Sequence, residues 1–262
     1  MRVLAGIAAL SMVVGGQTFA APMEVPVDLS SWTDEGAGSW SLRNGDNAVE
    51  QNDNGDATVF FNGVDAQGTQ LRGTIEVLGN QTTDDDFFGF VLGYQSGELF
   101  TNTADYFLID WKKADQTLRS GAEGLAGLAI SRVTGEIGTT SGGFDDAWAH
   151  ENVVAEIQRG TTLGRTGWEE DVVYDFDLTF QTDLIEVFVD GAKELSITPA
   201  DVVGLSSFGN GSLGFYNLSQ DDVLYAGLTE QEISMSAIPV PAALPLALAA
   251  FGALGFIGRR RR

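Results

Sequence analysis

The sequence predicts an all-β protein, an antiparallel β-sandwich or jelly roll that folds as a single domain. Short segments of apolar or alternating character recur along the middle of the chain, separated by turns rich in Gly, Asn and Asp. Between residues 21 and 237 no segment shows helical periodicity over ten or more positions. No internal repeat is evident, which argues against a propeller. The 262 residues include no cysteine, so the fold must depend on a large core or on metal.

The expected strands follow one another at close spacing. They cover residues 38–42, 48–51, 57–61, 71–77, 87–94, 106–112, 125–133, 153–158, 172–180, 184–189, 192–197, 212–218 and 223–228. In the segment at 172–180, apolar residues alternate with Asp and Thr, which predicts one buried and one solvated face. Asp190-Gly191 lies between two of these segments and predicts a tight hairpin.

Both ends of the chain carry segments expected to direct export. Residues 1–21 combine a basic start, an apolar stretch and small residues before the expected cleavage point, which is typical of a signal peptide. Residues 238–262 combine the sequence Ile-Pro-Val-Pro-Ala, 16 apolar residues and four terminal arginines. Sixteen apolar residues are barely enough to span a bilayer, and the arginines would stay on its cytoplasmic side.

The layout of this tail resembles the VPLPA or PEP type of C-terminal sorting signal, which bacterial exosortases recognise. The resemblance implies a protein held in the inner membrane through its C-terminal helix only until an exosortase-type enzyme cleaves the tail. The protein would then reach the cell surface or the extracellular matrix of a bacterium. The folded domain is therefore expected at residues 22–237.

The charge of this central domain excludes some partners. Between residues 21 and 237 nine basic residues stand against 37 acidic ones, so the net charge is about −28. Such a surface repels nucleic acid and anionic lipid headgroups, and it attracts cations. Solubility in a salty medium would explain the same charge without a specific partner.

The most distinctive stretch is Thr-Asp-Asp-Asp-Phe-Phe-Gly-Phe-Val-Leu-Gly-Tyr-Gln at residues 83–95. Asp84, Asp85 and Asp86 lie next to one another directly before an apolar strand, so their repulsion costs free energy unless a cation neutralises them. The chain has few Lys and Arg, and hard cations such as Ca2+ prefer clustered oxygen ligands. The sequence therefore predicts a calcium site here, with a solvated acidic turn as the alternative.

Asp110 and His150 are two further polar residues that are expected to form hydrogen bonds or to bind a metal ion. Asp110 lies in the interior of the strand expected at residues 106–112, where a carboxylate needs a partner, and it is a second candidate ligand. His150 is the only histidine, and without cysteine it cannot form a zinc site by itself. We expect a structural hydrogen-bonding role for His150.

Several blocks, in this order, resemble the C-terminal lectin-like domain of thrombospondins. The blocks are Phe61-Asn62-Gly63-Val64-Asp65 with Gly68-Thr69, Asp84-Asp85-Asp86 through Gln95, Tyr106 to Lys112, Ala147-Trp148-Ala149-His150, Gly167-Trp168, and Ser212 to Asp222. The resemblance implies a concanavalin- or L-type-lectin-like sandwich that binds Ca2+ and works in extracellular adhesion. Carried over by position, it implies Asp84, Asp85 and Asp86 as calcium ligands, with Asn62 and Asp65 behind them.

Three functions are compatible with the sequence. The first is a non-catalytic, calcium-binding adhesion module whose partner is a surface or matrix polysaccharide or a protein. The second is a carbohydrate-binding lectin, which a fold alone cannot establish. The third and weakest is a glycoside hydrolase, which needs two facing carboxylates. Asp175 and Asp177 have part of the required spacing, but Thr179 stands where a third acid would follow, so we interpret them as a solvated strand face.

Overall fold

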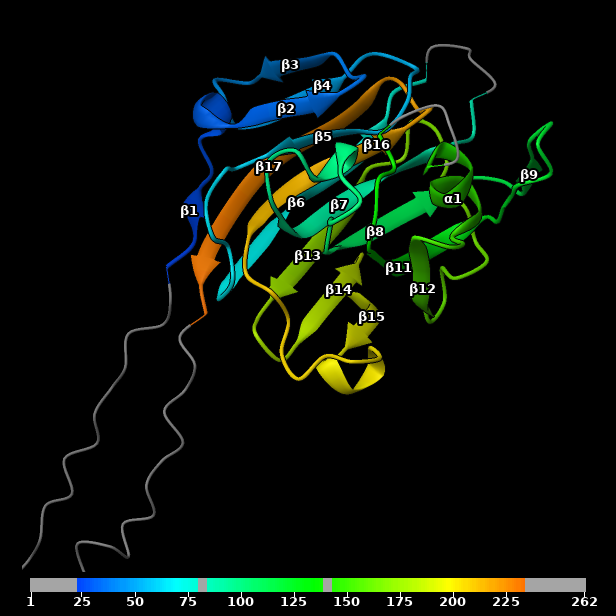
Figure 1. Ribbon diagram of the computed structural model, residues 1–262. Helices are drawn as coiled ribbons and strands as arrows, with labels where there is room; N and C mark the ends of the chain where they lie inside the picture. The colour runs from blue at the N-terminus through cyan, green and yellow to red at the C-terminus, as the bar shows by residue number, and fades with distance from the viewer. Residues whose placement is uncertain (1–22, 80–83, 139–142, 234–262) are drawn as a thin grey trace, which may run out of the picture.

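The computed structural model describes residues 23–79, 84–138 and 143–233, which form two antiparallel sheets packed face to face (Figure 1). The all-β sandwich expected from the sequence is confirmed. The expected signal peptide and sorting tail lie outside the described residues. Within the described ranges, no helix is long and apolar enough to cross a membrane.

The first sheet, called sheet A, has the strand order β15-β14-β13-β6-β17-β4-β3, and β1 pairs with the far part of β17. Its strands are β1 (Val25–Pro26), β3 (Trp40–Arg43), β4 (Ala48–Gln51), β6 (Thr69–Val77), β13 (Tyr174–Phe180), β14 (Ile185–Val189), β15 (Ala192–Ile197) and β17 (Val223–Glu232).

The second sheet, called sheet B, has the order β12-β11-β8-β7-β16-β5-β2. Its strands are β2 (Thr33–Gly36), β5 (Thr58–Phe61), β7 (Phe87–Tyr94), β8 (Tyr106–Lys112), β11 (Gly127–Val133), β12 (Val154–Arg159) and β16 (Ser212–Leu218). Outside the sheets lie a small hairpin of β9 (Gln116–Thr117) and β10 (Glu123–Gly124), helix α1 (Gly143–Ala149), and 3-10 turns at Leu29–Ser31, Glu98–Phe100 and Pro199–Asp201.

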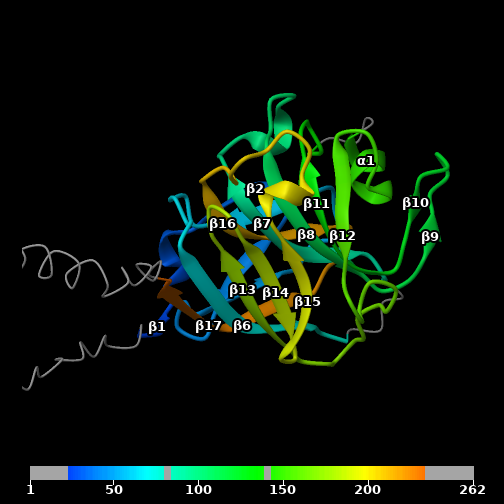
Figure 2. The same cartoon turned by 90° about the horizontal axis from the view of Figure 1, so that it is seen from below.

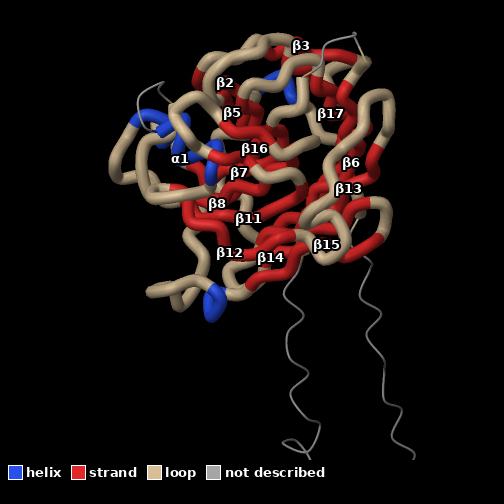
Figure 3. The backbone as a smooth tube through the Cα atoms, turned by 90° about the vertical axis from the view of Figure 1, so that its right-hand side faces the viewer, coloured by secondary structure: helices blue, strands red, loops and turns tan. Residues whose placement is uncertain are grey.

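The two sheets differ in how their outer faces are covered. Every residue of β7, β8 and β16 is buried, because α1 and neighbouring loops pack on the outer face of sheet B. Figure 3 shows α1 on one side of sheet B and sheet A on the other. In β14, by contrast, buried and part-exposed residues alternate, and Figure 2 shows β13, β14 and β15 facing the viewer without a helix in front of them. Sheet A therefore has one buried face and one open face.

Every expected strand is present, with ends that differ by a few residues. The largest difference is β17, which continues to Glu232 instead of ending at residue 228. A bulge between Ala226 and Thr229, with Gly227 at a φ of 62°, lets the strand resume its pairing with β6. Helix α1, the four-residue strand β2 and the two-residue strands β1, β9 and β10 were not predicted, because segments this short carry little or no periodic signal.

Close approach of backbones explains one glycine of the 83–95 stretch. Gly89 lies on β7 opposite Asp110 of β8, and a Cβ at this position would lie 1.9 Å from the Ile109 carbonyl oxygen. We expect Gly89→Ala to lower the free energy of unfolding by about 3 kcal/mol or more, since the obstacle is backbone that cannot turn away. Urea unfolding followed by tryptophan fluorescence measures this change.

Gly209→Ala is the matched control, because a Cβ at Gly209 would meet no atom within 4 Å. This variant should unfold within about 0.5 kcal/mol of the wild type. Equal stabilities for the two variants would contradict the close approach of β7 and β8.

Candidate functional site

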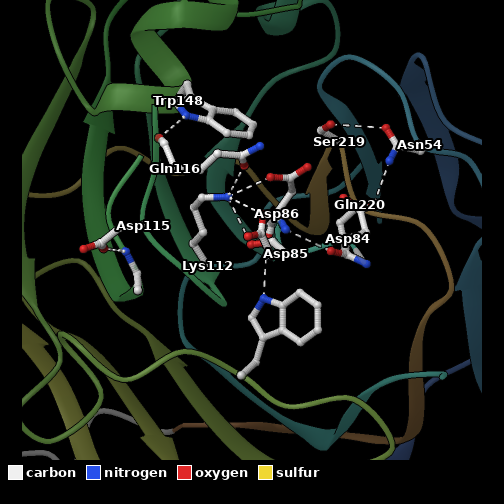
Figure 4. Close-up of polar contacts among 12 residues, drawn as sticks. Asn54, Asp84, Asp85, Asp86, Lys112, Asp115, Gln116, Trp148, Ser219 and Gln220 are labelled. Atoms are coloured by element: carbon white, nitrogen blue, oxygen red, sulfur yellow. Dashed lines mark hydrogen bonds and ion pairs between the residues drawn. The ribbon is translucent and has the colours of Figure 1, made fainter. Parts of the chain in front are cut away.

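The triple Asp of the sequence analysis lies against a buried lysine at one end of sheet B (Figure 4). Strand β7 begins at Phe87, directly after Asp86, and the register of the antiparallel pair places Phe87 opposite Lys112, the last residue of β8. The Lys112 side chain is fully buried. Its Nζ lies 2.7 Å from Asp86 Oδ1 and 3.3 Å from Asp85 Oδ1, and it donates to the Asp85 carbonyl oxygen at 3.0 Å.

Polar and aromatic groups from two loops, strand β9 and helix α1 hold this ion pair in place. The Asp86 backbone N–H donates to Gln220 Oε1 at 3.0 Å, and Trp168 Nε1 donates to the Asp86 carbonyl at 3.0 Å. Lys112 Nζ also donates to Gln116 Oε1 at 3.1 Å and lies 4.3 Å from the centre of the Trp148 ring. A buried charge requires this kind of complete partnering.

Lys112 changes the interpretation of the acidic run. The few basic residues in the chain had predicted that a divalent cation neutralises all three carboxylates. For Asp86, and in part for Asp85, the neutralising cation is the ammonium of Lys112. Burial raises the pKa of Asp85, and the neighbouring Lys112 opposes that rise.

Asp84 lies on the outer side of this pair, and no cationic side chain in the described part of the chain forms an ion pair with it. Its Oδ2 accepts a hydrogen bond from Asn54 Nδ2 at 2.6 Å, and Asn54 Oδ1 accepts one from Ser219 Oγ at 3.2 Å. Partial burial, a hydrogen bond with Asp86 and the charges of Asp86 and Asp221 raise the pKa of Asp84 to about 7. We call Asp84, Asp85, Asp86 and Asp221 the acidic edge. Of these four carboxylates, those of Asp85 and Asp86 contact the ammonium of Lys112.

Asn62 and Asp65, the other ligands implied by the resemblance, lie at the opposite end of the sheet. The Asn62 side-chain oxygen accepts from the backbone N–H groups of Val64 and Leu213. On β16, Leu213 is five residues from Leu218, which pairs with Phe87 beside Asp86. Five residues of strand span roughly 17 Å. One metal ion therefore cannot bind both Asn62 and the acidic edge.

Asp110 has the partner that its position required, and the partner is a histidine. Asp110 Oδ2 lies 2.9 Å from His150 Nε2, and His150 Nδ1 lies 3.3 Å from Glu156 Oε2. Arg159 pairs with the same Glu156 oxygen at 2.7 Å. The expected structural hydrogen-bonding role of His150 is confirmed. Asp110 Oδ1 and the nearby hydroxyl groups of Tyr106, Ser131 and Tyr216 are buried without a partner among the described residues.

The chain places these oxygen ligands in separate groups instead of one cage. Across residues 23–79, 84–138 and 143–233, no three His, Asp or Glu side chains are arranged so that they could hold a metal ion. Hard cations prefer carboxylate oxygens as ligands. Among the candidate ligands, Asp84 fits such a cation best, because it lies beside the negative charges of Asp86 and Asp221.

The sequence analysis missed Lys112 as part of this site, although strand parity could have found it. On β8, Lys112 shares a face with Tyr106, Leu108 and Asp110, which the alternation places opposite Phe107, Ile109 and Trp111. A lysine on the same strand face as a buried Asp is a signal for an internal ion pair. The contacts of Trp148 and Gln220 had no comparable local signal, since these residues lie in helix α1 and in the loop after β16, far along the chain from Lys112.

The two packed antiparallel sheets place this chain in the class of lectin-like β-sandwiches. The family model of the thrombospondin C-terminal region matches residues 35–232, and the chain belongs to this family. It is 26% identical over 200 residues to thrombospondin-2 of Gallus gallus and 25% identical over 199 residues to cartilage oligomeric matrix protein of Rattus norvegicus. Each match covers 72% of this chain, but only 16% and 25% of those longer relatives.

Solved structures agree with this fold at low sequence identity. A Bacillus subtilis protein of unknown function with a galectin-like fold matches with a TM-score of 0.51 at 11% identity, over 81% of this chain and 96% of that one. The VIP36 exoplasmic/lumenal domain, in a Ca2+/Man2-bound form, matches with a TM-score of 0.52 at 13% identity, over 80% and 84%. The carbohydrate-binding module CBM66 of Bacillus subtilis has a TM-score of 0.50 at 9% identity, over 77% and 95%.

Removing the buried ammonium should be strongly destabilising. We expect Lys112→Met to lower the free energy of unfolding by about 3–5 kcal/mol, because it leaves Asp86 buried without its cation. The double variant Lys112→Met/Asp86→Asn removes both charges. Its loss in free energy of unfolding should therefore be smaller than the sum of the losses of the two single variants. Urea unfolding of the four proteins measures the coupling.

Lys113→Met is the matched control for this series. Lys113 also has a carboxylate partner, Glu170 at 2.6 Å, and also lies over a tryptophan ring, but its side chain is 31% exposed. Its loss should cost about 1 kcal/mol or less. Additive effects of Lys112→Met and Asp86→Asn would contradict the buried pair.

The His150 network predicts a loss of stability in alkaline solution. Burial alone lowers the pKa of His150, but the Asp110 and Glu156 carboxylates outweigh it and raise the pKa to about 9 from 6.5. Because the folded-state pKa is the higher one, the stabilisation is complete below pH 6.5 and is lost as pH rises through 9. We expect the loss to be on the order of 3 kcal/mol in urea unfolding between pH 6.5 and 10.

The variant His150→Gln should be less stable than the wild type at pH 6.5 and should lack most of this pH dependence. If the free energy of unfolding of His150→Gln depended on pH as in the wild type, groups other than His150 would cause the loss of stability at alkaline pH.

Proposed function

We propose that this protein is an exported, non-catalytic, calcium-binding module that works in adhesion at the cell surface or in the extracellular matrix of a bacterium. In this proposal the C-terminal helix holds it in the inner membrane until an exosortase-type enzyme processes the tail. Membership of the thrombospondin C-terminal family supports the adhesion role. The excess of carboxylate over positive charge at the acidic edge carries the calcium part of the proposal.

Asp84 is the centre of the proposed calcium site. Its raised pKa means that a proton already offsets the repulsion from Asp86 and Asp221 near neutral pH. A calcium ion takes carboxylate oxygens and supplies two positive charges, so it would replace that proton. Asp85 and Asp86 remain candidate ligands through the oxygen atoms that Lys112 does not engage. Asn62, Asp65 and Asp110 would have no part in a site at this edge.

The polar groups with catalytic potential support a binding role instead of catalysis. Both ring nitrogens of His150 are engaged by Asp110 and Glu156, so neither is free to act as a base. Asp177 accepts hydrogen bonds from Arg72 and Gln70, so both of its carboxylate oxygens already have partners within sheet A.

The variant Asp84→Asn should keep the stability of the calcium-free protein but lose the stabilisation that calcium gives to the wild type. Without calcium at pH 8, we expect Asp84→Asn to be at least as stable as the wild type, because it removes a crowded negative charge and retains an oxygen for Asn54. With 5 mM calcium, roughly 100 times a dissociation constant of about 50 μM, the wild type alone should gain about 2.7 kcal/mol. Thermal unfolding with EDTA and with calcium measures both effects.

The calcium effect should also fall as pH drops below about 7, where Asp84 becomes protonated. Asp183→Asn is the control, since Asp183 is an exposed loop carboxylate outside the acidic edge, and it should keep the full calcium effect. The same proteins, produced in cells, test adhesion: EDTA should release wild-type protein from the surface fraction to the medium. An unfolding temperature that calcium leaves unchanged would overturn the proposed site.

A further inference from the structure

The open face of sheet A contains a groove of about 540 Å3, which we call the sheet-A groove. Its walls and floor include Glu24, Arg72, Thr74, Asp177, Phe188 and Thr229. The volume lies within the range of about 300–1,000 Å3 that small-molecule sites occupy. The acidic edge is bordered by strands of sheet B and belongs to the other layer of the sandwich.

The strand register places four chemically different side chains in one row across this groove. Phe188 of β14 pairs with Asp177 of β13, Asp177 pairs with Arg72 of β6, and Arg72 pairs with Thr229 of β17. Neighbouring strands lie about 4.8 Å apart, so the row is roughly 15 Å long. It presents, in order, an aromatic ring, a carboxylate, a guanidinium group and a hydroxyl group.

A continuous set of hydrogen bonds fixes the polar members of this row. Arg72 Nε donates to Asp177 Oδ2 at 2.9 Å, and Gln70 Nε2 donates to Asp177 Oδ1 at 2.5 Å. Gln231 Nε2 donates in turn to Gln70 Oε1, and Arg72 Nη1 donates to Glu24. Because these side chains are already ordered, a ligand that binds them has little rotamer entropy to remove.

The fixed groups still have hydrogen-bonding capacity that faces solvent. The Arg72 and Asp177 side chains are 39% and 26% exposed. A guanidinium group has five N–H donors, and contacts to described residues use only Nε and one hydrogen of Nη1. Each oxygen of Asp177 has a second lone pair. Donors and acceptors therefore lie side by side along the row.

Phe188 supplies the apolar part of the groove. It is an aromatic residue on the outer face of sheet A, and its ring is only partly buried. Lys193 Nζ lies 5.5 Å from the centre of the Phe188 ring and forms an ion pair with Glu186. These two contacts restrict the positions of the Lys193 and Phe188 side chains. Gly73, Gly191 and Gly227 also line the groove, so no side chain projects from the sheet at these positions.

We infer that the sheet-A groove binds a neutral polysaccharide. A sugar hydroxyl both donates and accepts hydrogen bonds, so neighbouring hydroxyls match the alternating donors and acceptors of Arg72 and Asp177. The C–H face of a sugar ring is apolar and fits the ring of Phe188. This inference rests on the proposed role as an adhesion module and supplies its partner.

Charge favours a neutral chain over an acidic one. Glu24, Asp175 and Asp177 outnumber Arg72 among the residues that line the groove, and the central domain carries a net charge of about −28. A polymer of uronic acids or a sulfated polymer would be repelled. A peptide that extended the sheet would pair with an edge strand and would not use the face.

Affinity electrophoresis of the full chain in native gels tests the inference. The gels contain galactomannan, β-glucan or mannan as neutral probes, or alginate as an acidic one. We expect at least one neutral polysaccharide to retard the wild type and alginate not to do so. Arg72→Met, Asp177→Asn and Phe188→Ala should each weaken this retardation by about tenfold or more.

Arg43→Met is the matched control. Arg43 also lies on sheet A, pairs with a carboxylate (Glu50, 3.0 Å) and has a 44% exposed side chain, but it is outside the groove. This variant should be retarded like the wild type, and thermal unfolding should show that all variants are folded. Lack of retardation by every neutral probe, equal retardation by alginate, or unchanged retardation of the three groove variants would overturn the inference.

The test of polysaccharide binding can fail independently of the test of calcium binding. The groove residues do not touch the acidic edge, so EDTA should leave retardation unchanged below the unfolding temperature. If calcium shifts the unfolding temperature and the protein stays at the surface while no neutral probe binds, the groove inference alone fails. If neutral probes bind and calcium has no effect, the calcium proposal alone fails.

Discussion

The buried ion pair between Lys112 and Asp86 is the interaction on which this end of the sandwich depends. An ammonium group without exposed surface must be fully partnered, and its partners come from three separate segments of the chain: Asp85 and Asp86 before β7, Gln116 of β9 and Trp148 of α1. The start of β7, the end of β8, the loop that carries Gln220 and helix α1 with Trp148 all meet here. The same pair leaves Asp84 outside it, where partial burial and the charges of Asp86 and Asp221 raise the pKa of Asp84 to about 7.

The different cover of the two sheets divides the molecule into a structural layer and an open layer. Sheet B is packed on both faces, so polar residues on its outer face, such as Asp110 and Lys112, are used in internal pairs. Sheet A packs on one face only, and the polar residues of its other face remain within reach of a ligand. The comparisons show the family and the fold; the open face and the acidic edge are properties of this chain's own residues.

Much of the fold was predictable from local patterns, whereas the site was predictable only in part. Alternation and turn residues identified the strands and the face of each side chain, because these depend on neighbours in sequence. The acidic run before β7 was also visible. Asn62 and Asp65 were grouped with it by resemblance, but the length of β16 separates them from it by most of a strand. Asp177, interpreted from the sequence as part of a solvated strand face, does lie on the open face of sheet A, but its bonds to Arg72 and Gln70 were not predicted.

The sequence by itself determined the all-β class, the order and faces of the strands, and the concentration of carboxylates before residue 87. The tertiary structure decided which residues meet. Arg72 and Asp177 are 105 positions apart, and they pair only because β6 and β13 are neighbours in sheet A. Lys112, and not a metal ion, occupies the place beside Asp86 only because β7 and β8 pair in one register. The pairing of strands is the one that leaves the least apolar area exposed and the fewest buried charges without a partner. Both quantities depend on residues from several strands, so the sequence of a single strand does not determine them.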